Sequence, residues 1–524
     1  MLHFNFTTFR RHWQHDFTHE PSPLPSFALP LERPNLAQLA AMDEESLPLL
    51  VRQSPTAMRY LGLLGDLDWA HFPERPENRA WPGPTPAPRA PYLAAYLVKI
   101  EEGKTYMSGL RTFLVEQPAL VWLLGFPLVP DDQAPCGFDV EASVPSRKQL
   151  GRVLRTLPDG QARFLFRCTV QLLADELGDV ADFGDEISLD TKHIIAWVCE
   201  NNPKERMADR FVKQNQPKGD PDCKVGFKSM SNQRSKAHKT AKSDLPSADA
   251  AAKTPTKDGK PVSEQKEGEF FWGYASGVVA NKIDGWGEFA LAELTQTFDH
   301  SDPSYFLPLM GQTEENLGRK PRYGALDAAF DAFFVHEYFY EAGGFAAVPW
   351  ADRTDHRKSF DDQGLPLCPA GLAMPLKSTF FKRSHCLVPH ECGRFGCPLS
   401  LPGGEGQEEP GAEDENGAEG EKTTCPIDHP NWFKQDGCIT TLPTSIGNRL
   451  RHQLDRESDE YKNLYRQRSA TERINSQAVN LGIERPKLRN QRSIANQTTL
   501  IYVLINLRAL QRVRELKAAG GPQC

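Results

Sequence analysis

Three acidic residues that lie far apart in the sequence stand where their carboxylates could bind metal ions together. Asp190 interrupts the β-branched, largely apolar stretch EISLDTKHIIAWV, Asp327 follows a short apolar stretch, and Glu472 lies in the polar stretch YRQRSATERINSQA. Carboxylate oxygens are the hard ligands that Mg²⁺ prefers. Two such ions about 4 Å apart can activate a water or a 3′-hydroxyl and stabilise the leaving oxygen in a displacement at phosphorus. We therefore expect a two-metal site for phosphoryl transfer.

Two further side chains accompany Glu472 at helical spacing. Tyr465 and Arg468 precede it by seven and four residues, which puts all three side chains on one face of an α-helix. The guanidinium group of an arginine can hold two phosphate oxygens at once, so Arg468 suits contact with a nucleic-acid backbone. The stretch contains no proline or glycine, and we expect one uninterrupted helix.

Each acidic residue also has an ordinary structural explanation. Glu472 could pair with Arg468 on a solvated helix surface. Asp327 could cap the helix that follows it, and Asp331, one turn further on, competes with it as the site residue. Asp190 is harder to explain in this way, because an unpaired carboxylate in a buried strand is costly. Only the three residues together, each in its own motif, favour a site.

The elements around these residues predict an α/β layer fold. EISLDTKHIIAWV predicts a buried strand or strand pair, and FFWGYASGVVANKIDGWGEFALAELTQTF predicts two strands with a glycine-rich connection. A helix is expected after Asp302. The segment 322–350 predicts a strand that ends at Asp327, a helix and a second strand, which is the pattern of a parallel pair. The apolar residues of that helix are Phe330, Phe333, Phe334 and Phe339. Carboxylates from such elements can converge at the carboxyl edge of the sheet.

The first 180 residues predict a helical region with proline-rich interruptions, one of them near Pro118. SVPSRKQLGRVLRTLPDGQARFLFRCTVQLLADEL predicts two helices around the turn LPDG. The first of these helices carries the basic residues Arg147, Lys148, Arg152 and Arg155. The pair could be a helix-turn-helix that contacts DNA, or a plain helical hairpin with a solvated basic face.

Composition and charge narrow the class of protein. With 39% hydrophobic and 25% charged residues, the 524-residue chain resembles an ordinary soluble protein. No stretch approaches the roughly 20 apolar residues of a membrane span, and the N-terminus does not resemble a secretion signal, so we expect a cytoplasmic protein. The net charge of −8 argues against a uniformly basic nucleic-acid binder. The net charge conceals an uneven distribution, because 404–421 is acidic and 449–517 is rich in Arg and Lys. The last predicted helix spans about 493–517.

Two segments interrupt the predicted elements. The segment 228–267 is polar, has almost no large apolar residues and predicts disorder. The segment 350–448 is irregular and holds six of the eleven cysteines, an odd number that suits a reducing compartment. The candidate ligands of a structural zinc ion are Cys392, Cys397, Cys425, His429 and Cys438. Because no Cys-x2-Cys pair is present, a set of reduced thiols is the alternative.

Taken together, these segments resemble the DDE transposases of bacterial insertion sequences, in particular the group with a Y-x2-R-x3-E-x6-K signature. Tyr465, Arg468 and Glu472 match the Y, R and E of that signature. SLDTKHI resembles the segment around the first Asp of the family, GDPDCKVGFK the loop that follows it, and ALDAAFD the motif of the second Asp. The likeness covers roughly residues 186–510 apart from the insertions.

The resemblance implies a ribonuclease-H-like (retroviral-integrase-like) core, in which a mixed sheet is flanked by helices. Such a core cleaves DNA at the ends of the insertion sequence and joins those ends to a target by strand transfer. On this basis Asp190, Asp327 and Glu472 are the catalytic residues and hold two Mg²⁺ ions, for which Mn²⁺ can substitute. Tyr465 and Arg468 would contact phosphate near the scissile bond.

The resemblance also implies partners and an organisation along the chain. The partner is double-stranded DNA, both transposon ends and target, bound by a homodimer or higher assembly in the bacterial nucleoid, with no membrane contact. The expected regions are a helical DNA-binding region at 1–180, the first part of the catalytic core at 186–349 with its insert at 228–267, a Cys-rich and acidic insertion at 350–448, and a catalytic helix with basic C-terminal helices at 449–524.

One position departs from the pattern of the family. The final Lys of the signature falls at Val479, which cannot contact phosphate. Arg473 could supply a cation for DNA, as could Lys487, although Lys487 lies too far along the chain to take the role by alignment. Otherwise the protein would be a catalytically inactive or repurposed DNA-binding protein. A stand-alone nuclease on the same core is a third alternative.

Overall fold

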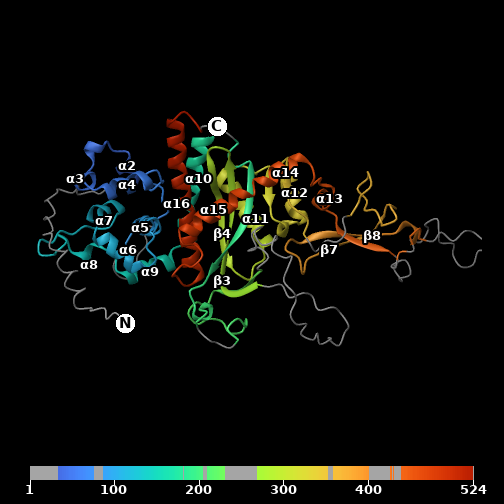
Figure 1. The fold of residues 1–524 in the computed structure, drawn as a ribbon, viewed down its shortest axis with the longest axis horizontal. Helices are drawn as coiled ribbons and strands as arrows, with labels where there is room; N and C mark the ends of the chain where they lie inside the picture. Colours follow the sequence, from blue (N-terminus) through green and yellow to red (C-terminus); the bar gives the residue numbers. More distant parts are fainter. Residues whose placement is uncertain are drawn as a thin grey trace, which may run out of the picture.

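The structure is a computed structural model that describes residues 34–75, 87–180, 182–204, 209–229, 268–351, 358–400, 425–427, 429 and 438–522. The predicted disordered insert lies almost wholly outside these described residues, and the acidic run lies wholly outside them. Figure 1 shows helices of the N-terminal region on one side, a central sheet with helices around it, and a small second sheet on the other side. The fold is mixed α/β, with a mixed sheet flanked by helices, as the sequence predicts.

The central sheet combines antiparallel and parallel strands. Its strands are β1 (Glu186–Ile195), β2 (Lys224–Ser229), β3 (Gly268–Ile283), β4 (Gly287–Thr297), β5 (Tyr323–Leu326) and β6 (Phe345–Ala347). The main path runs β4–β3–β1–β5–β6, and β2 pairs with the first part of β3. β1 is antiparallel to β3 and parallel to β5, which is parallel to β6. The predicted two-strand unit and the predicted parallel pair are confirmed, and EISLDTKHIIAWV forms a single strand.

β1 changes character halfway along its length. Ile187, Leu189 and Ile194 have no exposed surface, as expected for a strand covered on both faces. From Asp190 to His193 the residues are only partly buried. The sheet is therefore apolar at the start of β1 and becomes polar at Asp190, in the middle of the strand.

Helices cover both faces of the sheet. One face carries α11 (Phe306–Leu317) and α12 (Phe333–Glu341), and the other carries α14 (Asp459–Arg466), α15 (Ser469–Asn480) and α16 (Gln491–Ala518). α12 packs so closely on β5 that a Cβ added to Gly324 would come within 2.3 Å of the Phe339 ring. The helices predicted after Asp302, before 343–344 and near the C-terminus are confirmed. Phe330 differs from the prediction, because it closes the short helix η6 (Ala328–Phe330) before α12 begins.

The N-terminal region is helical, as predicted. Its elements are α2 (Leu36–Ala40), η1 (Glu44–Ser46), α3 (Leu49–Arg52), α4 (Pro55–Leu64), α5 (Ala90–Glu101), α6 (Met107–Val115), α7 (Pro118–Leu124), α8 (Val140–Ser143), α9 (Arg147–Thr156) and α10 (Asp159–Leu177). The predicted break is confirmed at Pro118, which begins α7 because proline fits the first turn of a helix but not its interior. Within the described residues, no helix combines the length and the apolar character needed to span a bilayer.

α16 joins the N-terminal region to the sheet (Figure 1). The Nδ2 of Asn496 donates to the carbonyl oxygens of Leu154 and Leu157, at 3.2 and 3.1 Å. Further along, the Nδ2 of Asn506 donates to the Thr169 hydroxyl at 3.0 Å and to the Ala290 carbonyl oxygen at 2.8 Å. Both asparagines are buried. Since buried amides without partners are costly, these bonds fix the position of α16 between α9, α10 and β4.

The insertion forms a sheet of its own. Its strands β7 (Leu376–Lys382), β8 (His390–Gly396) and β9 (Ile439–Pro443) are antiparallel and ordered β7–β8–β9. Every residue of β7 is exposed. The chain returns to the core through α13 (Ile446–Gln453), which packs on α12.

A buried carboxylate holds α13, the helix through which the chain returns from the insertion to the core. The side chain of Asp331 has no exposed surface, and it accepts hydrogen bonds from Nε and Nη2 of Arg451, both at 2.7 Å. Arg456 and His336 also lie close, at 3.7 and 3.5 Å from Oδ1. Burial alone would raise the pKa of Asp331, but the hydrogen bonds from Arg451 and His336 outweigh it and hold that pKa well below its usual range.

We predict that Asp331→Asn lowers the free energy of unfolding by about 3–5 kcal/mol, because it leaves the cations of Arg451 and Arg456 buried without their anion. Urea unfolding followed by circular dichroism measures this change. The matched control is Asp284→Asn, whose carboxylate is largely exposed beside Lys282 and should change stability by less than about 0.5 kcal/mol. Equal midpoints for the two variants would contradict an anchoring role for Asp331.

Candidate carboxylate site

The strand register brings Asp190 and Asp327 to the same level of the sheet. β1 and β5 are parallel, and Leu189 pairs with Leu326. The next residue on each strand is therefore Asp190 on β1 and Asp327 at the end of β5. Neighbouring strands lie about 4.8 Å apart, so these two residues come from adjacent positions. Oδ1 of Asp327 also accepts a hydrogen bond from the N–H of Ala328 at 2.5 Å, so Asp327 caps η6 as well.

The stretch that carries Glu472 differs from the single helix predicted for it. α14 ends at Arg466 and α15 begins at Ser469, with Arg468 as the residue that precedes α15. The turn keeps helical backbone angles at Gln467 and Arg468, so the spacing still brings the side chains together. Nη2 of Arg468 donates to Oε1 of Glu472 at 2.5 Å. The ion pair considered as the ordinary explanation for Glu472 is thus present.

Electrostatic effects link this turn to the two strands. Burial raises the pKa of Asp190 to about 6. The Thr191 N–H, which donates to Asp190 at 2.8 Å, and the nearby Arg468 lower this pKa, whereas the neighbouring charges of Asp327 and Asp302 raise it. Opposite charges favour the ionised form of a carboxyl group and like charges disfavour it, so Arg468 offsets part of the effect of burial and of the neighbouring carboxylates.

The pKa of Tyr465 responds to burial and to the charges of Arg468, Asp327 and Glu472. Burial raises the pKa of Tyr465, Arg468 lowers it, and Asp327 and Glu472 raise it further. Its ring stacks on Tyr461 with the centroids 5.9 Å apart. Asp190 thus interacts with Asp327 and Arg468, and Tyr465 interacts with Asp327, Arg468 and Glu472, although these residues come from three separate parts of the chain.

A buried amide oxygen faces the same group. Nδ2 of Asn475 donates to Oδ2 of Asp190 at 3.4 Å. Asn475 is only 8% exposed, and its Oδ1 has no hydrogen-bond partner. Because an unsatisfied buried carbonyl oxygen is costly, a bound water or cation beside Asp190 would stabilise this arrangement. Asn475 follows Glu472 by three residues on α15, so helical spacing could have identified it.

The residues have the chemistry that Mg²⁺ requires, but the carboxylates are not arranged as a ligand set. Among the described residues, no three His, Cys, Asp or Glu side chains are placed to hold a metal ion. Glu472 is paired with Arg468 instead. The donors are nonetheless hard carboxylate oxygens with an amide oxygen beside them, which matches the preference of Mg²⁺. The donor set therefore fits this ion in type.

Asp302 is a fourth carboxylate that sequence reasoning missed. It begins η5 (Asp302–Tyr305), and its Oδ1 accepts a hydrogen bond from the hydroxyl of Thr191 at 2.8 Å. Burial raises the pKa of Asp302, the Thr191 hydroxyl lowers it, and Asp327 raises it. The segment DPSYF predicts only a helix start, so no local signal distinguishes this Asp from an ordinary cap.

Other predicted residues lie away from this group. Nη1 of Arg473 binds Oε1 of Glu288 at 2.5 Å, at the end of the sheet where β4 begins. Val479 packs on the hydrophobic core, and Lys487 lies over the ring of Trp197. Asp331, the competitor of Asp327, is enclosed by its arginines in the fold. None of these four residues contacts the carboxylate group.

The basic residues of α9 are exposed, as a DNA-contacting surface requires: Arg147, Lys148, Arg152 and Arg155. The opposite face of α9 is buried through Leu150, Val153 and Leu154. α10, the second helix of the pair, packs along α16 and β4. α10 keeps an exposed face with Arg163 and Arg167, so the helix-turn-helix and the plain hairpin both stay open.

The candidate zinc ligands divide into two places. Cys392 pairs with Pro443, whereas Cys397 lies at the other end of β8 and its N–H donates to the Cys438 carbonyl oxygen at 2.9 Å. The two residues are five positions apart along an extended strand, which separates their backbones by about 17 Å, too far for the two thiols to share a zinc ion. Sγ of Cys438 lies 3.4 Å from Nδ1 of His429, and Cys425, four residues before that histidine, is buried.

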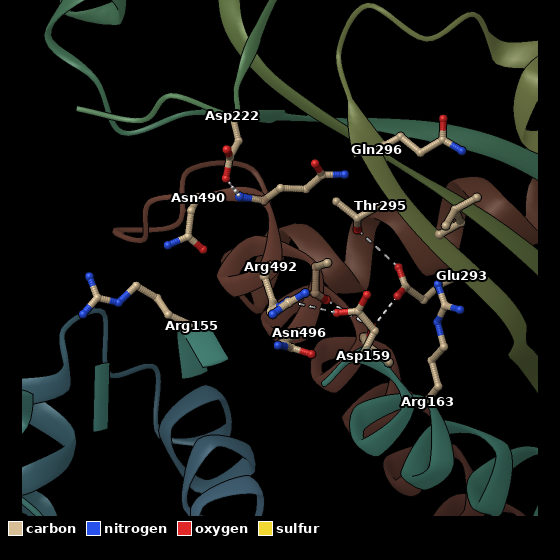
Figure 2. A pocket seen from close by; sticks show the side chains of 14 residues that line it. Arg155, Asp159, Arg163, Asp222, Glu293, Thr295, Gln296, Asn490, Arg492 and Asn496 are labelled. Atoms are coloured by element: carbon tan, nitrogen blue, oxygen red, sulfur yellow. Dashed lines mark hydrogen bonds and ion pairs between the residues drawn. The ribbon is translucent and has the colours of Figure 1, made fainter. Parts of the chain in front are cut away.

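A cavity of about 590 Å³ lies on the N-terminal side of the sheet, away from these carboxylates. Figure 2 shows Arg155, Arg163 and Arg492 around it, together with Asp159 and the buried Glu293. Asp222 is a third acidic residue of the lining, so three acidic and three basic side chains face the cavity. The charge of the lining therefore does not select a ligand.

Glu293 is the unusual residue of this cavity wall. It pairs with Val278 on β3, and Val278 pairs with Asp190 on β1. All three therefore point to the same face of the sheet. Burial raises the pKa of Glu293 to about 7, while hydrogen bonds from the Thr499 and Thr295 hydroxyls lower it. The hydroxyl of Thr499 donates to its Oε1.

We predict that Glu293→Gln removes a pH dependence of stability. The pKa of Glu293 is higher in the folded chain than its ordinary value of 4.5, so the wild type loses stability as the pH rises from about 4.5 to about 7, by roughly 3 kcal/mol. Urea unfolding at pH 5 and pH 8 measures the effect, and the variant should gain relative to the wild type only at pH 8. The control Glu315→Gln changes an exposed carboxylate and should follow the wild type. Parallel profiles for wild type and Glu293→Gln would refute the prediction.

Comparison of the chain with protein-family models, with curated proteins and with solved structures finds no match.

Proposed function

We propose that the protein is a DNA transposase that performs Mg²⁺-dependent cleavage and strand transfer at the ends of an insertion sequence. The observation that supports the proposal is the adjacent placement of Asp190 and Asp327 on β1 and at the end of β5, with Arg468 near Asp190 and paired with Glu472. These residues come from segments up to 282 positions apart in the sequence. The three motifs that the sequence singled out are therefore linked through Arg468.

The sheet supports the proposal of a ribonuclease-H-like core. Three antiparallel strands, β4, β3 and β1, continue into the parallel strands β5 and β6. The first acidic residue lies on the central strand and the second follows its parallel neighbour. The carboxyl ends of parallel strands are where α/β sheets commonly hold their sites. This topology is the one we expect of an integrase-like fold.

The mechanism assigns a role to each residue. Asp190, Asp327 and Glu472 would hold two Mg²⁺ ions, or Mn²⁺ in their place, and when bound these ions activate the attacking oxygen and stabilise the leaving oxygen. Arg468 would exchange its bond to Glu472 for phosphate oxygens, which its planar fork can hold in pairs. Asn475 orients Asp190 through its Nδ2.

The surroundings would bind the DNA. Arg147, Lys148 and Arg152 are exposed on α9 and would contact the phosphate backbone, and binding should weaken steeply with salt. Arg473 would contribute to DNA binding only if it left Glu288. Homodimers or higher assemblies on paired ends belong to this proposal, as does a place in the bacterial nucleoid.

A catalytically inactive or repurposed DNA-binding protein is the alternative. Val479 replaces the final Lys of the signature and packs on the core, and neither Arg473 nor Lys487 contacts the carboxylate group. The site would then lack one phosphate contact of the family. This observation favours reduced or lost cleavage, with DNA binding retained.

We predict Mg²⁺-dependent nicking of DNA that carries the flanking inverted repeats. Asp190→Asn, Asp327→Asn and Glu472→Gln should each lower the nicking rate roughly a thousandfold or more, because each removes a charged ligand from a unit that acts together. The control Asp179→Asn alters an exposed carboxylate and should nick at the wild-type rate. Gel analysis of end-labelled DNA measures the amount of nicked DNA that each variant forms.

The outcomes separate the candidates. Nicking followed by joining to a target supports the transposase, whereas nicking without joining supports a nuclease. Binding without nicking by the wild type supports the inactive alternative. Absence of both binding and nicking would overturn the proposal.

We also propose that Cys397, Cys425, His429 and Cys438 hold a structural zinc ion, for which their side chains would have to move together because they are not placed as a ligand set. The proposal rests on the strand ends that carry Cys397 and Cys438, which meet, and on the contact of Cys438 with His429. Zinc commonly takes four such ligands. The isolated protein should then contain about one zinc per chain by atomic emission. Cys438→Ser should lose that zinc and Cys386→Ser should keep it. A zinc-free wild type, purified with zinc present, would leave reduced thiols as the answer.

A further inference from the structure

A second surface of the molecule combines aromatic and basic side chains. A groove of about 350 Å³ lies where the chain leaves β1, between the segment 195–203 and the segment 485–489 that connects α15 to α16. Trp197 forms part of its wall and is 39% exposed. We call this surface the Trp197 groove.

Two cations are held over one indole ring in the Trp197 groove. Cζ of Arg489 lies 4.9 Å from the ring centroid, and Nζ of Lys487 lies 5.6 Å from it. The edge of Tyr106 meets the same ring at 6.3 Å between centroids. Cations repel one another, but the negative face of a tryptophan ring attracts both. Trp197 therefore keeps two positive charges together at a surface.

The basic segment is fixed to the catalytic strand. The N–H of Ile195 donates to the carbonyl oxygen of Glu484 at 2.8 Å. The side chain of the same Glu484 pairs with Nζ of Lys192 at 2.5 Å. Because Lys192 lies two residues beyond Asp190 on β1, the position of the cations is coupled rigidly to the carboxylate site.

The charge of the Trp197 groove selects an anion. Arg485, Lys487 and Arg489 line it, and no acidic residue does. The cavity of Figure 2 differs in this respect, because three acids balance its three arginines. A local excess of three positive charges on a chain of net charge −8 indicates a local binding site for a polyanion.

The distance from the carboxylates suits a DNA backbone. Trp197 lies seven residues beyond Asp190 along β1 and its continuation, which corresponds to at most about 23 Å. Successive phosphates of one DNA strand are about 3.4 Å apart along the helix axis. A duplex with one phosphodiester at Asp190 could therefore reach the Trp197 groove within about seven base pairs.

We propose that the Trp197 groove binds the phosphodiester backbone of DNA about seven base pairs from the phosphate that lies at the carboxylate site. This inference rests on the proposed function, because it takes the carboxylates as the point where DNA is cut. Lys487 and Arg489 contact phosphate, and Trp197 is a positioning residue that keeps them together. The groove thus fixes the register of the duplex relative to Asp190.

The first test measures the salt dependence of DNA binding by fluorescence anisotropy. The double variant Lys487→Gln/Arg489→Gln should raise Kd roughly tenfold and lower the slope of log Kd against log salt by about 1.8, since each lost phosphate contact removes about 0.9. The control Lys282→Gln/Lys320→Gln removes the same charge at the opposite end of β1 and should leave the slope unchanged. Equal slopes for both double variants would overturn the proposal.

Two substitutions test the role of the ring. Trp197→Ala should raise Kd about three- to tenfold, because the two cations lose the face that gathers them. Trp197→Phe keeps an aromatic face and should recover most of the affinity. If Trp197→Ala binds DNA like the wild type, the ring does not position the cations.

The register is tested by cross-linking. Cys199 is exposed and lines the groove, so it should form a disulfide with a thiol tethered to a phosphate about five to eight base pairs from the nick, and not with one at the nick. Cys199→Ser is the control and should give no cross-link. A cross-link at the nick instead would overturn the proposed spacing.

Two comparisons separate this inference from the proposed function. If the wild type nicks DNA but Lys487→Gln/Arg489→Gln binds and nicks normally, only the groove assignment fails. If the wild type binds no DNA, the proposed function fails as well. Pyrophosphate distinguishes a free phosphate site from a backbone site: at millimolar concentration it should not displace DNA, and displacement at micromolar concentration would contradict a DNA groove.

Discussion

A carboxylate in the central strand of the sheet constrains everything around it. Asp190 lies on β1 between two paired strands, and burial raises its pKa to about 6. Water cannot fully solvate a group in this position, and the protein supplies three polar partners: the Thr191 N–H, Arg468 and the amide of Asn475. Arg468 lies in the turn between α14 and α15, and Asn475 lies within α15. An apolar residue at this position would need none of these partners, because only a polar group is costly to bury without hydrogen bonds.

Burial also acts to raise the pKa of two other carboxyl groups, Asp331 and Glu293, but their neighbours differ. Asp331 meets two arginines and stays ionised, so it fastens the end of the insertion to α12. Glu293 meets only hydroxyl groups and a more distant Arg163, and burial raises its pKa to about 7. The hydroxyl of Tyr502 lies 3.5 Å from that of Ser276, on the face of the sheet that carries both Asp190 and Glu293. These three acidic residues therefore differ in their surroundings: Asp190 belongs to the candidate site, Asp331 anchors the insertion, and Glu293 is a pH-sensitive part of the core.

Much of the fold could be predicted because its signals are local. The apolar run around Asp190, the hydrophobic pattern of β3 and β4, and the glycines after α12 each indicate one element and its limits. The parallel pair of β5 and β6 followed from a strand, a helix and a strand in succession. The assignment of Asp190, Asp327 and Glu472 to one site came instead from motifs and the resemblance to a family, and it stays a prediction. The break between α14 and α15 at Gln467 and Arg468 was not predicted. No proline or glycine marks it, so the local sequence indicates one continuous helix.

The sequence by itself determined which elements form and which acidic residues they carry, because hydrophobic periodicity and capping act over a few residues. Only the tertiary structure decided the partners of each carboxylate. Asp302 accepts a hydrogen bond from Thr191, whereas Asp331, four residues after Asp327, binds Arg451. The separation of Cys392 from Cys397 and the gathering of Lys487 and Arg489 over Trp197 were decided in the same way. Each depends on strand register and on contacts between distant segments, and a local pattern of residue types carries no information about either.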